Sequence, residues 1–147
     1  MMNMKKMKLV FDTSVIDEYA DYYFTLHPRA RKKPIPHPYH ESINKWMILK
    51  RPAMNALKQK WKDFGVWFIG KKGLTDMNIE KCQMLFYTFY GTNHKHDPDN
   101  SVPKFILDSF VESHLIVGDD CEHLEELRLR CSVDIDNPRT EITIWYE

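Results

Sequence analysis

The clearest periodic pattern in the chain follows Pro52. Apolar residues recur there every three or four positions, which places them on one face of a helix. They are Met54, Leu57, Trp61, Phe64 and Phe68. Proline suits the first turn of a helix, where its missing amide hydrogen is not needed. The pattern therefore predicts an amphipathic helix that begins at Pro52 and ends before the turn at Gly70 and Gly73.

Two kinds of strand pattern follow in the second half of the chain. Cys82–Tyr90, CQMLFYTFY, is rich in aromatic and apolar residues, as expected for a buried strand. Residues 127–135 alternate between apolar and polar side chains, and residues 142–144 repeat this alternation. Because a turn-forming sequence at residues 136–139 separates the two segments, the pattern predicts a hairpin over residues 127–145.

The N-terminal segments give weaker patterns. We interpret residues 1–20 as an N-terminal extension with a short strand at Lys8–Phe11 and one helical turn. Asp21–Leu26, DYYFTL, is short and aromatic and favours a strand. Prolines at positions 28, 34, 36 and 38 exclude a helix or a central strand, which leaves an extended, mobile loop.

A second helix is expected between the two strand regions. Ser101 is a suitable N-cap, and Pro103 suits the start of a helix. Apolar residues follow at helical spacing, and Gly118 ends the segment. Together these elements predict an α/β fold, in which a single compact domain over residues 21–147 holds a mixed sheet and two main helices.

Composition agrees with a soluble domain. The chain has 147 residues, of which 43% are hydrophobic, enough for one packed core. No stretch is long and apolar enough to cross a bilayer, and Asp12 interrupts the apolar run near the N-terminus, so no secretory signal is expected. The three cysteines lack CxxC spacing, which indicates reduced thiols in a cytoplasmic protein without a zinc site.

The net charge of zero hides a strong asymmetry between the two halves of the chain. Residues 1–75 hold 15 Lys and Arg against 6 Asp and Glu, and residues 76–147 hold 6 against 15. The basic residues are densest in a loop over residues 28–50 and just beyond it, where Glu41 is the only acid. Such a loop is either a solvated segment or an arm that contacts phosphates. Its candidate DNA-binding residues are Arg29, Arg31, Lys32, Lys33, Lys45, Lys50 and Arg51.

Four aspartates form two clusters in the acidic half. Asp97 and Asp99 belong to the sequence DPDN, and Asp119-Asp120 follows about twenty positions later. Either cluster alone is also typical of turns and helix caps. Concentrated carboxylates repel one another, and a hard divalent cation such as Mg²⁺ neutralises them through oxygen ligands. With Lys104 between the clusters, the pattern favours a metal site for phosphoryl chemistry.

The order of these features resembles the RusA family of Holliday junction resolvases. The matching sequence is DPDNSVPKFILDSFVESHLIVGDD, followed by NPRTEITI. The resemblance covers residues 21–147 in element order and is most specific over residues 97–144. It implies a Mg²⁺-dependent endodeoxyribonuclease, with Mn²⁺ as a possible substitute. It also implies a homodimer that resolves four-way DNA junctions in recombination and repair, in the cytoplasm of a bacterial or phage-infected cell.

The resemblance also implies roles for individual residues. Asp97, Asp99 and Asp120 match the essential aspartates of the family, and Lys104 matches its catalytic lysine. Asp119 joins the three other aspartates as a candidate metal ligand. The expected reaction is hydrolysis by a metal-bound hydroxide, with the metal and the lysine stabilising charge on the phosphate.

Two alternatives stay open for the whole protein, and two for single residues. The chain could bind branched DNA without cutting it, or could cut another branched or flap substrate. Lys104 could equally be a surface residue paired with Asp108, four positions further along the helix. His94 and His96 precede the first aspartates and could make the local charge depend on pH.

Overall fold

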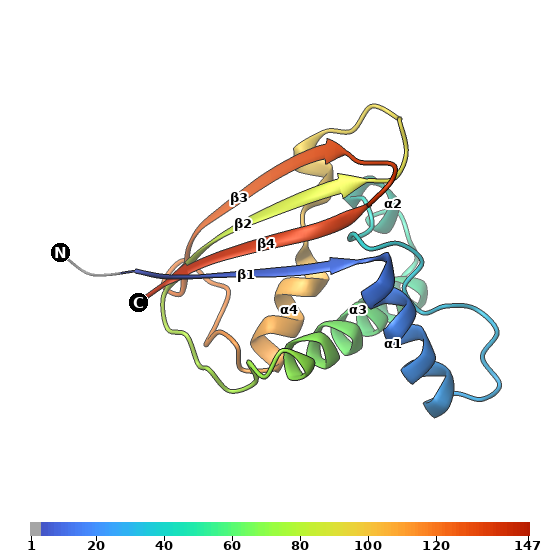
Figure 1. Cartoon of the computed structure of the whole chain (residues 1–147), viewed down its shortest axis with the longest axis horizontal. Helices are drawn as coiled ribbons and strands as arrows, with labels where there is room; N and C mark the ends of the chain where they lie inside the picture. Colours follow the sequence, from blue (N-terminus) through green and yellow to red (C-terminus); the bar gives the residue numbers. More distant parts are fainter. Residues whose placement is uncertain (1–3) are drawn as a thin grey trace.

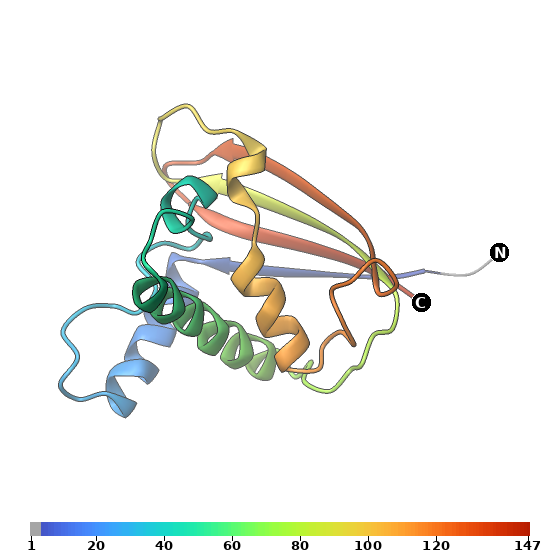
Figure 2. The same cartoon turned by 180° about the vertical axis from the view of Figure 1, so that it is seen from behind.

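A four-stranded mixed sheet carries the helices on one of its faces (Figure 1), as the view from behind also shows (Figure 2). The computed structural model describes residues 4–147. The strands are β1 (Lys5–Asp12), β2 (Cys82–Tyr90), β3 (Leu124–Val133) and β4 (Arg139–Tyr146). The helices are α1 (Thr13–Leu26), α2 (Ile43–Trp46), α3 (Arg51–Lys71), α4 (Lys104–Glu112) and the 3₁₀ turn η1 (Pro98–Ser101). The predicted α/β class with a mixed sheet is confirmed.

The strand order is β1-β4-β2-β3, which contradicts the predicted hairpin. Both strands of that hairpin exist, but β3 runs parallel to β2, while β4 lies between β1 and β2 and is antiparallel to both. The alternation along a strand shows which face is buried and does not specify the neighbouring strand. The apolar β2 takes an interior position, and the more charged β3 takes an edge, where one side needs no partner.

The N-terminal segment is part of the sheet and of its helical layer, so its interpretation as an extension is wrong. β1 pairs with β4 along its whole length, from Lys5 opposite Tyr146 to Asp12 opposite Arg139. The strand predicted at residues 21–26 is the second half of α1. The Asp12 carboxylate caps this helix by accepting a hydrogen bond from the Val15 amide at 3.1 Å.

Helical spacing explains why α1 overrides the strand preference of its aromatic residues. Its buried residues are Ile16, Tyr19 and Ala20, which lie on one face of the helix. The Tyr19 ring contacts the Phe64 ring of α3 with a centroid separation of 5.2 Å. Residues 21–26 alone do not show this face, because the helical spacing of apolar residues is visible only over the whole segment Thr13–Leu26.

The predicted helix after Pro52 is α3, and its apolar face packs against the sheet and against α4. Phe64 and Phe68 meet the Phe11 ring of β1 edge-on, at centroid separations of 5.2 and 5.5 Å. At Gly65 α3 and α4 come very close, since an added Cβ would lie 1.8 Å from the Ser109 Oγ. The absence of a side chain at Gly65 is therefore required for this packing.

The start of α4 differs from the prediction. Ser101 belongs to η1, where its hydroxyl donates to the Pro98 carbonyl at 2.6 Å, and α4 itself begins at Lys104. α1 is a third substantial helix beside the two expected ones. Within residues 4–147, no helix has both the length and the apolar character needed to cross a membrane.

Candidate functional site

The first aspartate cluster lies beyond the carboxyl ends of two parallel strands. β2 and β3 end side by side, with Tyr90 opposite Val133. The chain leaves β2 at Tyr90 and reaches Asp97 and η1 through a short loop, which a 3.8 Å contact between the Cys131 Sγ and the His96 carbonyl joins to β3. Functional sites of open α/β sheets commonly occupy this edge.

At this edge the DPDN turn meets the C-terminal half of the basic loop. A pocket of about 310 Å³ is lined by Asp97 and Asn100 from the turn and by Glu41 and Lys45 from the other segment. The Asn44 side-chain amide donates to the Asn100 side-chain oxygen at 3.1 Å. Two carboxylates and two lysines, Lys45 and Lys95, therefore share a solvent-accessible pocket. The remaining lining residues are His37, Tyr39, His40, Ser42, Tyr90 and His96.

His40 fixes the position of this segment from within the core. Its Nε2 accepts a hydrogen bond from the Phe105 amide at 3.1 Å, and its Nδ1 lies 2.8 Å from the Glu41 carbonyl. A backbone amide can only donate, so Nε2 is unprotonated and the proton sits on Nδ1. Burial of the ring lowers the pKa of His40 to about 4, because the charged form would lose its hydration.

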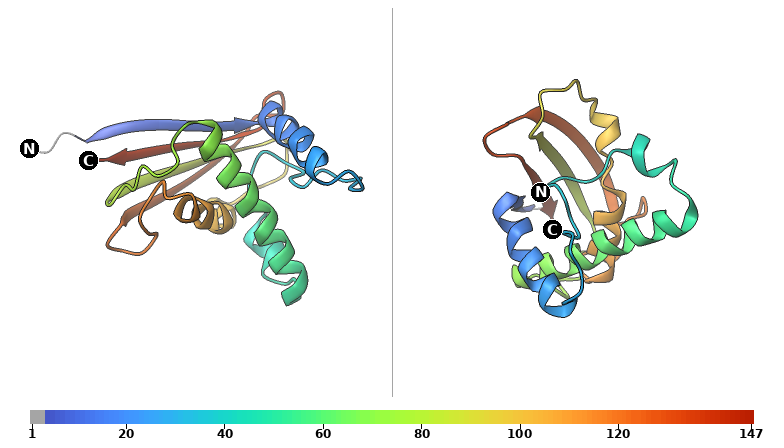
Figure 3. Two further views of the ribbon diagram at one scale, coloured as in Figure 1. Left: turned by 90° about the horizontal axis from the view of Figure 1, so that it is seen from below. Right: turned by 90° about the vertical axis from the view of Figure 1, so that its right-hand side faces the viewer.

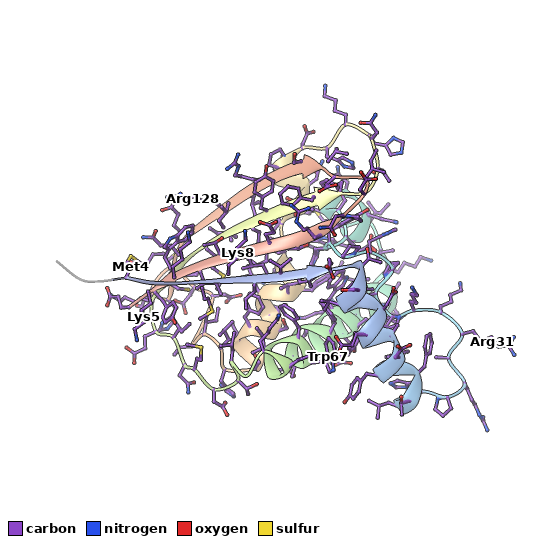
Figure 4. The ribbon with its side chains drawn as sticks, in the orientation of Figure 1. Met4, Lys5, Lys8, Arg31, Trp67 and Arg128 are labelled. Carbon is purple, nitrogen blue, oxygen red and sulfur yellow. The ribbon has the colours of Figure 1, made fainter. Side chains whose placement is uncertain are left out.

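The basic loop has an anchored half and a projecting half. Ile35 and Pro38 are buried, and the Pro38 carbonyl accepts a hydrogen bond from the Thr140 hydroxyl at 2.8 Å. The prolines led us to expect a mobile loop, but this half of it is held against the body of the protein. The preceding part projects from the body of the protein, with Arg31 near its tip (Figure 4).

The candidate DNA-binding residues spread over this projecting half, α2 and the start of α3, and all are exposed. Lys33 forms an ion pair with Asp17 at 2.6 Å, and Lys45 lies 3.7 Å from Glu41. The others are Arg29, Arg31, Lys32, Lys50 and Arg51.

The second aspartate cluster lies at the opposite end of the sheet. Asp119 and Asp120 precede the first residue of β3, Leu124, which pairs with the first residue of β2. The nine residues of β2 therefore separate this cluster from the DPDN edge, a distance of about 26 Å at the usual rise per residue. The four aspartates expected to share a metal site do not meet within one chain.

Asp120 has neighbours that the sequence did not indicate. Its carboxylate accepts hydrogen bonds from the Glu122 and His123 amides at 2.9 and 3.3 Å. One ligand atom from each of these three side chains lies within 4.8 Å of the others, the spacing of a possible cation site. The His123 Nδ1 also lies 2.8 Å from the Glu80 carbonyl, which ties this turn to the start of β2.

Lys104 and Asp99 are near Asp97 and Asn100 in the sequence, but they are not among the residues that line the pocket. Both side chains are exposed. The Lys104 Nζ lies 3.6 Å from the Asp108 carboxylate, and Lys58 approaches the same group at 3.9 Å. Lys104 thus forms the surface ion pair with Asp108 that is the alternative to a catalytic role.

Glu41 is a pocket residue that no sequence motif indicates. In the sequence it stands out only as the single acid in the basic stretch. Its side chain is largely buried, with 14% of its surface exposed, and it lines the pocket together with Asp97. These carboxylates and the amide of Asn100 offer oxygen donors, which fit Mg²⁺ or Mn²⁺ better than softer metals.

No family model and no curated protein matches this chain.

Proposed function

We propose that this protein is a Mg²⁺-dependent endonuclease that cuts branched DNA, with a four-way junction as its substrate, as its resemblance to the RusA family implies. The observation that carries the proposal is the pocket at the carboxyl ends of β2 and β3. There two carboxylates, Asp97 and Glu41, line one pocket together with Lys45, and the projecting half of the basic loop precedes Glu41 in the sequence. Carboxylates for a metal beside cations for a phosphate are what hydrolysis of a phosphodiester needs.

Each part of the pocket has a distinct role in this proposal. Asp97 and Glu41 would hold Mg²⁺, which when bound would activate a water and stabilise charge on the phosphate. Lys45 would orient the phosphodiester through its oxygens, and the exposed arginines of the basic loop would hold the duplex arms. His40, through its bond to the Phe105 amide, would keep the segment that carries Glu41 in place.

The separation of the aspartates supports a site shared by two chains. The resemblance assigns roles to Asp97, Asp99 and Asp120, yet Asp120 lies a full strand length from the pocket. A homodimer with a twofold axis would solve this if the pocket of each chain faced the Asp120 end of its partner. In such an isologous contact the pairing occurs twice, which yields two equivalent sites. Two sites suit the paired nicks needed to resolve a junction.

Cleavage of a labelled junction tests the proposal. The purified protein is incubated with a four-way junction and with a matched linear duplex, in Mg²⁺ and in EDTA. We expect paired nicks in the junction only, and only with Mg²⁺. Asp97→Asn should abolish nicking and keep junction binding, because it removes a metal ligand and a charge that repels phosphate. Full nicking by purified Asp97→Asn would overturn the assignment of Asp97.

A second candidate function is binding of branched DNA without cleavage. It is favoured by the structural partners of two predicted catalytic residues, since Asp120 caps its own turn and Lys104 pairs with Asp108. The same incubation separates the two functions. Tight junction binding without nicks in either Mg²⁺ or Mn²⁺ would support the binding function and leave the aspartates with structural roles.

A further inference from the structure

The face of the sheet opposite the helices is uncovered by any element within residues 4–147 (Figure 3). Side chains along a strand alternate between the two faces, so the outward residues of β2 are those between its buried ones. They are Gln83, Leu85, Tyr87 and Phe89. A solvated sheet face is usually polar. Here the central strand β2 is apolar and aromatic on this face, which indicates a binding surface for a ligand with flat apolar groups.

Three aromatic rings lie on this open face. Tyr87 and Phe89 stack on each other, with ring centroids 4.2 Å apart and an interplanar angle of 11°. Trp145 of β4 lies opposite Gln83 in the register and therefore on the same face. All three side chains are partly exposed. The face thus carries a stacked aromatic pair on β2 and a separate indole ring on β4, with the Leu85–Thr143 pair between them.

Each ring carries a cation against it. The Arg130 guanidinium lies 4.8 Å from the centre of the Tyr87 ring, and that of Arg139 lies 3.8 Å from the centre of the Phe89 ring. The Trp145 ring has two cationic neighbours at 5.9 Å, Lys6 from β1 and Arg128 from β3. Guanidinium planes, like aromatic rings, are surfaces on which nucleic-acid bases stack.

The charge of the open face is positive. Its five cations are Lys6, Lys8, Arg128, Arg130 and Arg139, and its four carboxylates are Asp12, Glu126, Asp134 and Glu141, of which Asp134 and Glu141 both pair with Arg139. Among the described residues, no carboxylate lies within 4.0 Å of the charged groups of Lys6 or Arg130. Lys8 and Arg128 have ion-pair partners but keep 54% and 58% of their side-chain surface exposed, and both are labelled over the sheet in Figure 4.

We propose that this open face binds single-stranded nucleic acid, with bases stacked on Trp145 and on the Arg130 guanidinium that lies over the stacked Tyr87–Phe89 pair, and with phosphates held by the surrounding cations. Unpaired bases can lay their faces against an indole ring or a guanidinium plane, whereas a duplex keeps those faces stacked inside. The surface shares no residue with the pocket at Asp97, so this binding goes beyond the proposed cleavage of branched DNA.

A second copy of the chain is a poorer occupant of the open face. A twofold contact would place the same patch on itself, and its excess cations would face excess cations. A polyanion instead neutralises them and releases its counterions, so binding should weaken as salt rises. Charge complementarity therefore favours nucleic acid over self-association.

Fluorescence anisotropy with a short labelled oligothymidylate, in EDTA to prevent cleavage, tests the proposal. Tyr87→Leu and Phe89→Leu keep an apolar side chain and remove the ring. Arg130→Gln removes a cation that has no carboxylate partner within ion-pair distance among the described residues. Lys72→Gln is the matched control, since it removes an exposed cation from the helical side of the molecule. Thermal unfolding and sedimentation of each variant monitor folding and mass.

We expect each of the first three substitutions to weaken oligothymidylate binding about tenfold, with Lys72→Gln close to the wild type. A competing unlabelled duplex should displace the probe poorly. Equal affinity of the folded Tyr87→Leu and wild-type proteins would overturn the proposal. It would also fail if Tyr87→Leu converted a dimer to a monomer, because the face would then be an interface between copies. Neither result depends on whether the protein cuts a junction.

Discussion

The Nε2 atom of His40 caps α4 by accepting the hydrogen bond of the Phe105 amide, across 65 positions of sequence. The residue before the helix, Pro103, gives no side-chain cap. A residue of the loop region thus supplies what the helix lacks locally. In this way, the stability of α4 and the position of Glu41 at the pocket depend on the same imidazole.

This bond predicts a dependence of stability on pH. The pKa of His40 falls to about 4 in the folded protein, against about 6.5 in an unfolded chain. The folded state therefore binds fewer protons between these values, and its stability falls as the pH drops from about 6.5 towards 4, by at most about 3 kcal/mol. Above pH 6.5 the contribution is constant.

Urea unfolding at several pH values, compared between the wild type and His40→Gln, measures this contribution. Glutamine can accept the amide hydrogen bond but does not titrate, so the other histidines cancel in the difference between the two proteins. We expect this difference to shrink on acidification. A difference that stays constant from pH 7 to pH 4 would show that His40 does not titrate as its burial implies.

Mixing two inactive variants tests whether the site is shared between subunits. In a dimer of one Asp97→Asn chain and one Asp120→Asn chain, a shared site has one fully wild-type copy. A site within one chain has none. We therefore expect each variant alone to be inactive and the remixed proteins to regain nicking of one strand per junction. Continued inactivity after confirmed subunit exchange, measured with two differently tagged chains, would exclude the shared site.

Glu41→Gln tests the residue that only the structure brought to the pocket. It removes a charge beside Asp97 but keeps the size of the side chain. We expect at least a hundredfold loss of nicking at low Mg²⁺, partly recovered at high Mg²⁺, because one candidate ligand is gone. Glu18→Gln, an exposed change on α1 that touches neither the pocket nor the turn at Asp120, is the control. Equal nicking by the two variants over a range of Mg²⁺ would remove Glu41 from the site.

The contact between Gly65 and Ser109 predicts a stability effect far from the pocket. Gly65→Ala would place a Cβ 1.8 Å from the Ser109 Oγ and 2.4 Å from its Cβ, so the helices must separate. We expect a loss of about 1–3 kcal/mol in the free energy of unfolding. Adding Ser109→Gly removes both clashing atoms and should restore part of the loss. Adding Ser109→Ala leaves the Cβ clash and should restore less. Equal rescue by both would place the strain elsewhere.

The sequence correctly predicted the elements whose own residues show a clear helical or strand pattern. The helix after Pro52 and the strand Cys82–Tyr90 carry their own signals, and the structure confirms both. The hairpin failed because strand partners are set by the whole sheet, in which β4 pairs with β1 and β2. The helical face of α1 was not recognised because the segment was divided at residue 20, which separated its buried residues from the second half of the helix.

The candidate site was predicted only in part for the same reason. Local sequence located Asp97 near the end of a strand, but the approach of Glu41 depends on a loop held by His40 and Pro38. The distance between Asp97 and Asp120 follows from the parallel pairing of β2 and β3, which no spacing along the chain encodes. The resemblance therefore predicted that Asp97 and Asp120 share a site, but within one chain they lie at opposite ends of the sheet.

The position of β4 has a consequence for how the protein is made. This last strand lies between the first strand and β2, so both halves of the sheet stay unjoined until it arrives. On the ribosome, β1 and β2 would have unpaired edges until β4 is synthesised, and the helices would form first. We expect the sheet to form only after β4 has been synthesised, with chaperones covering the open strand edges before then.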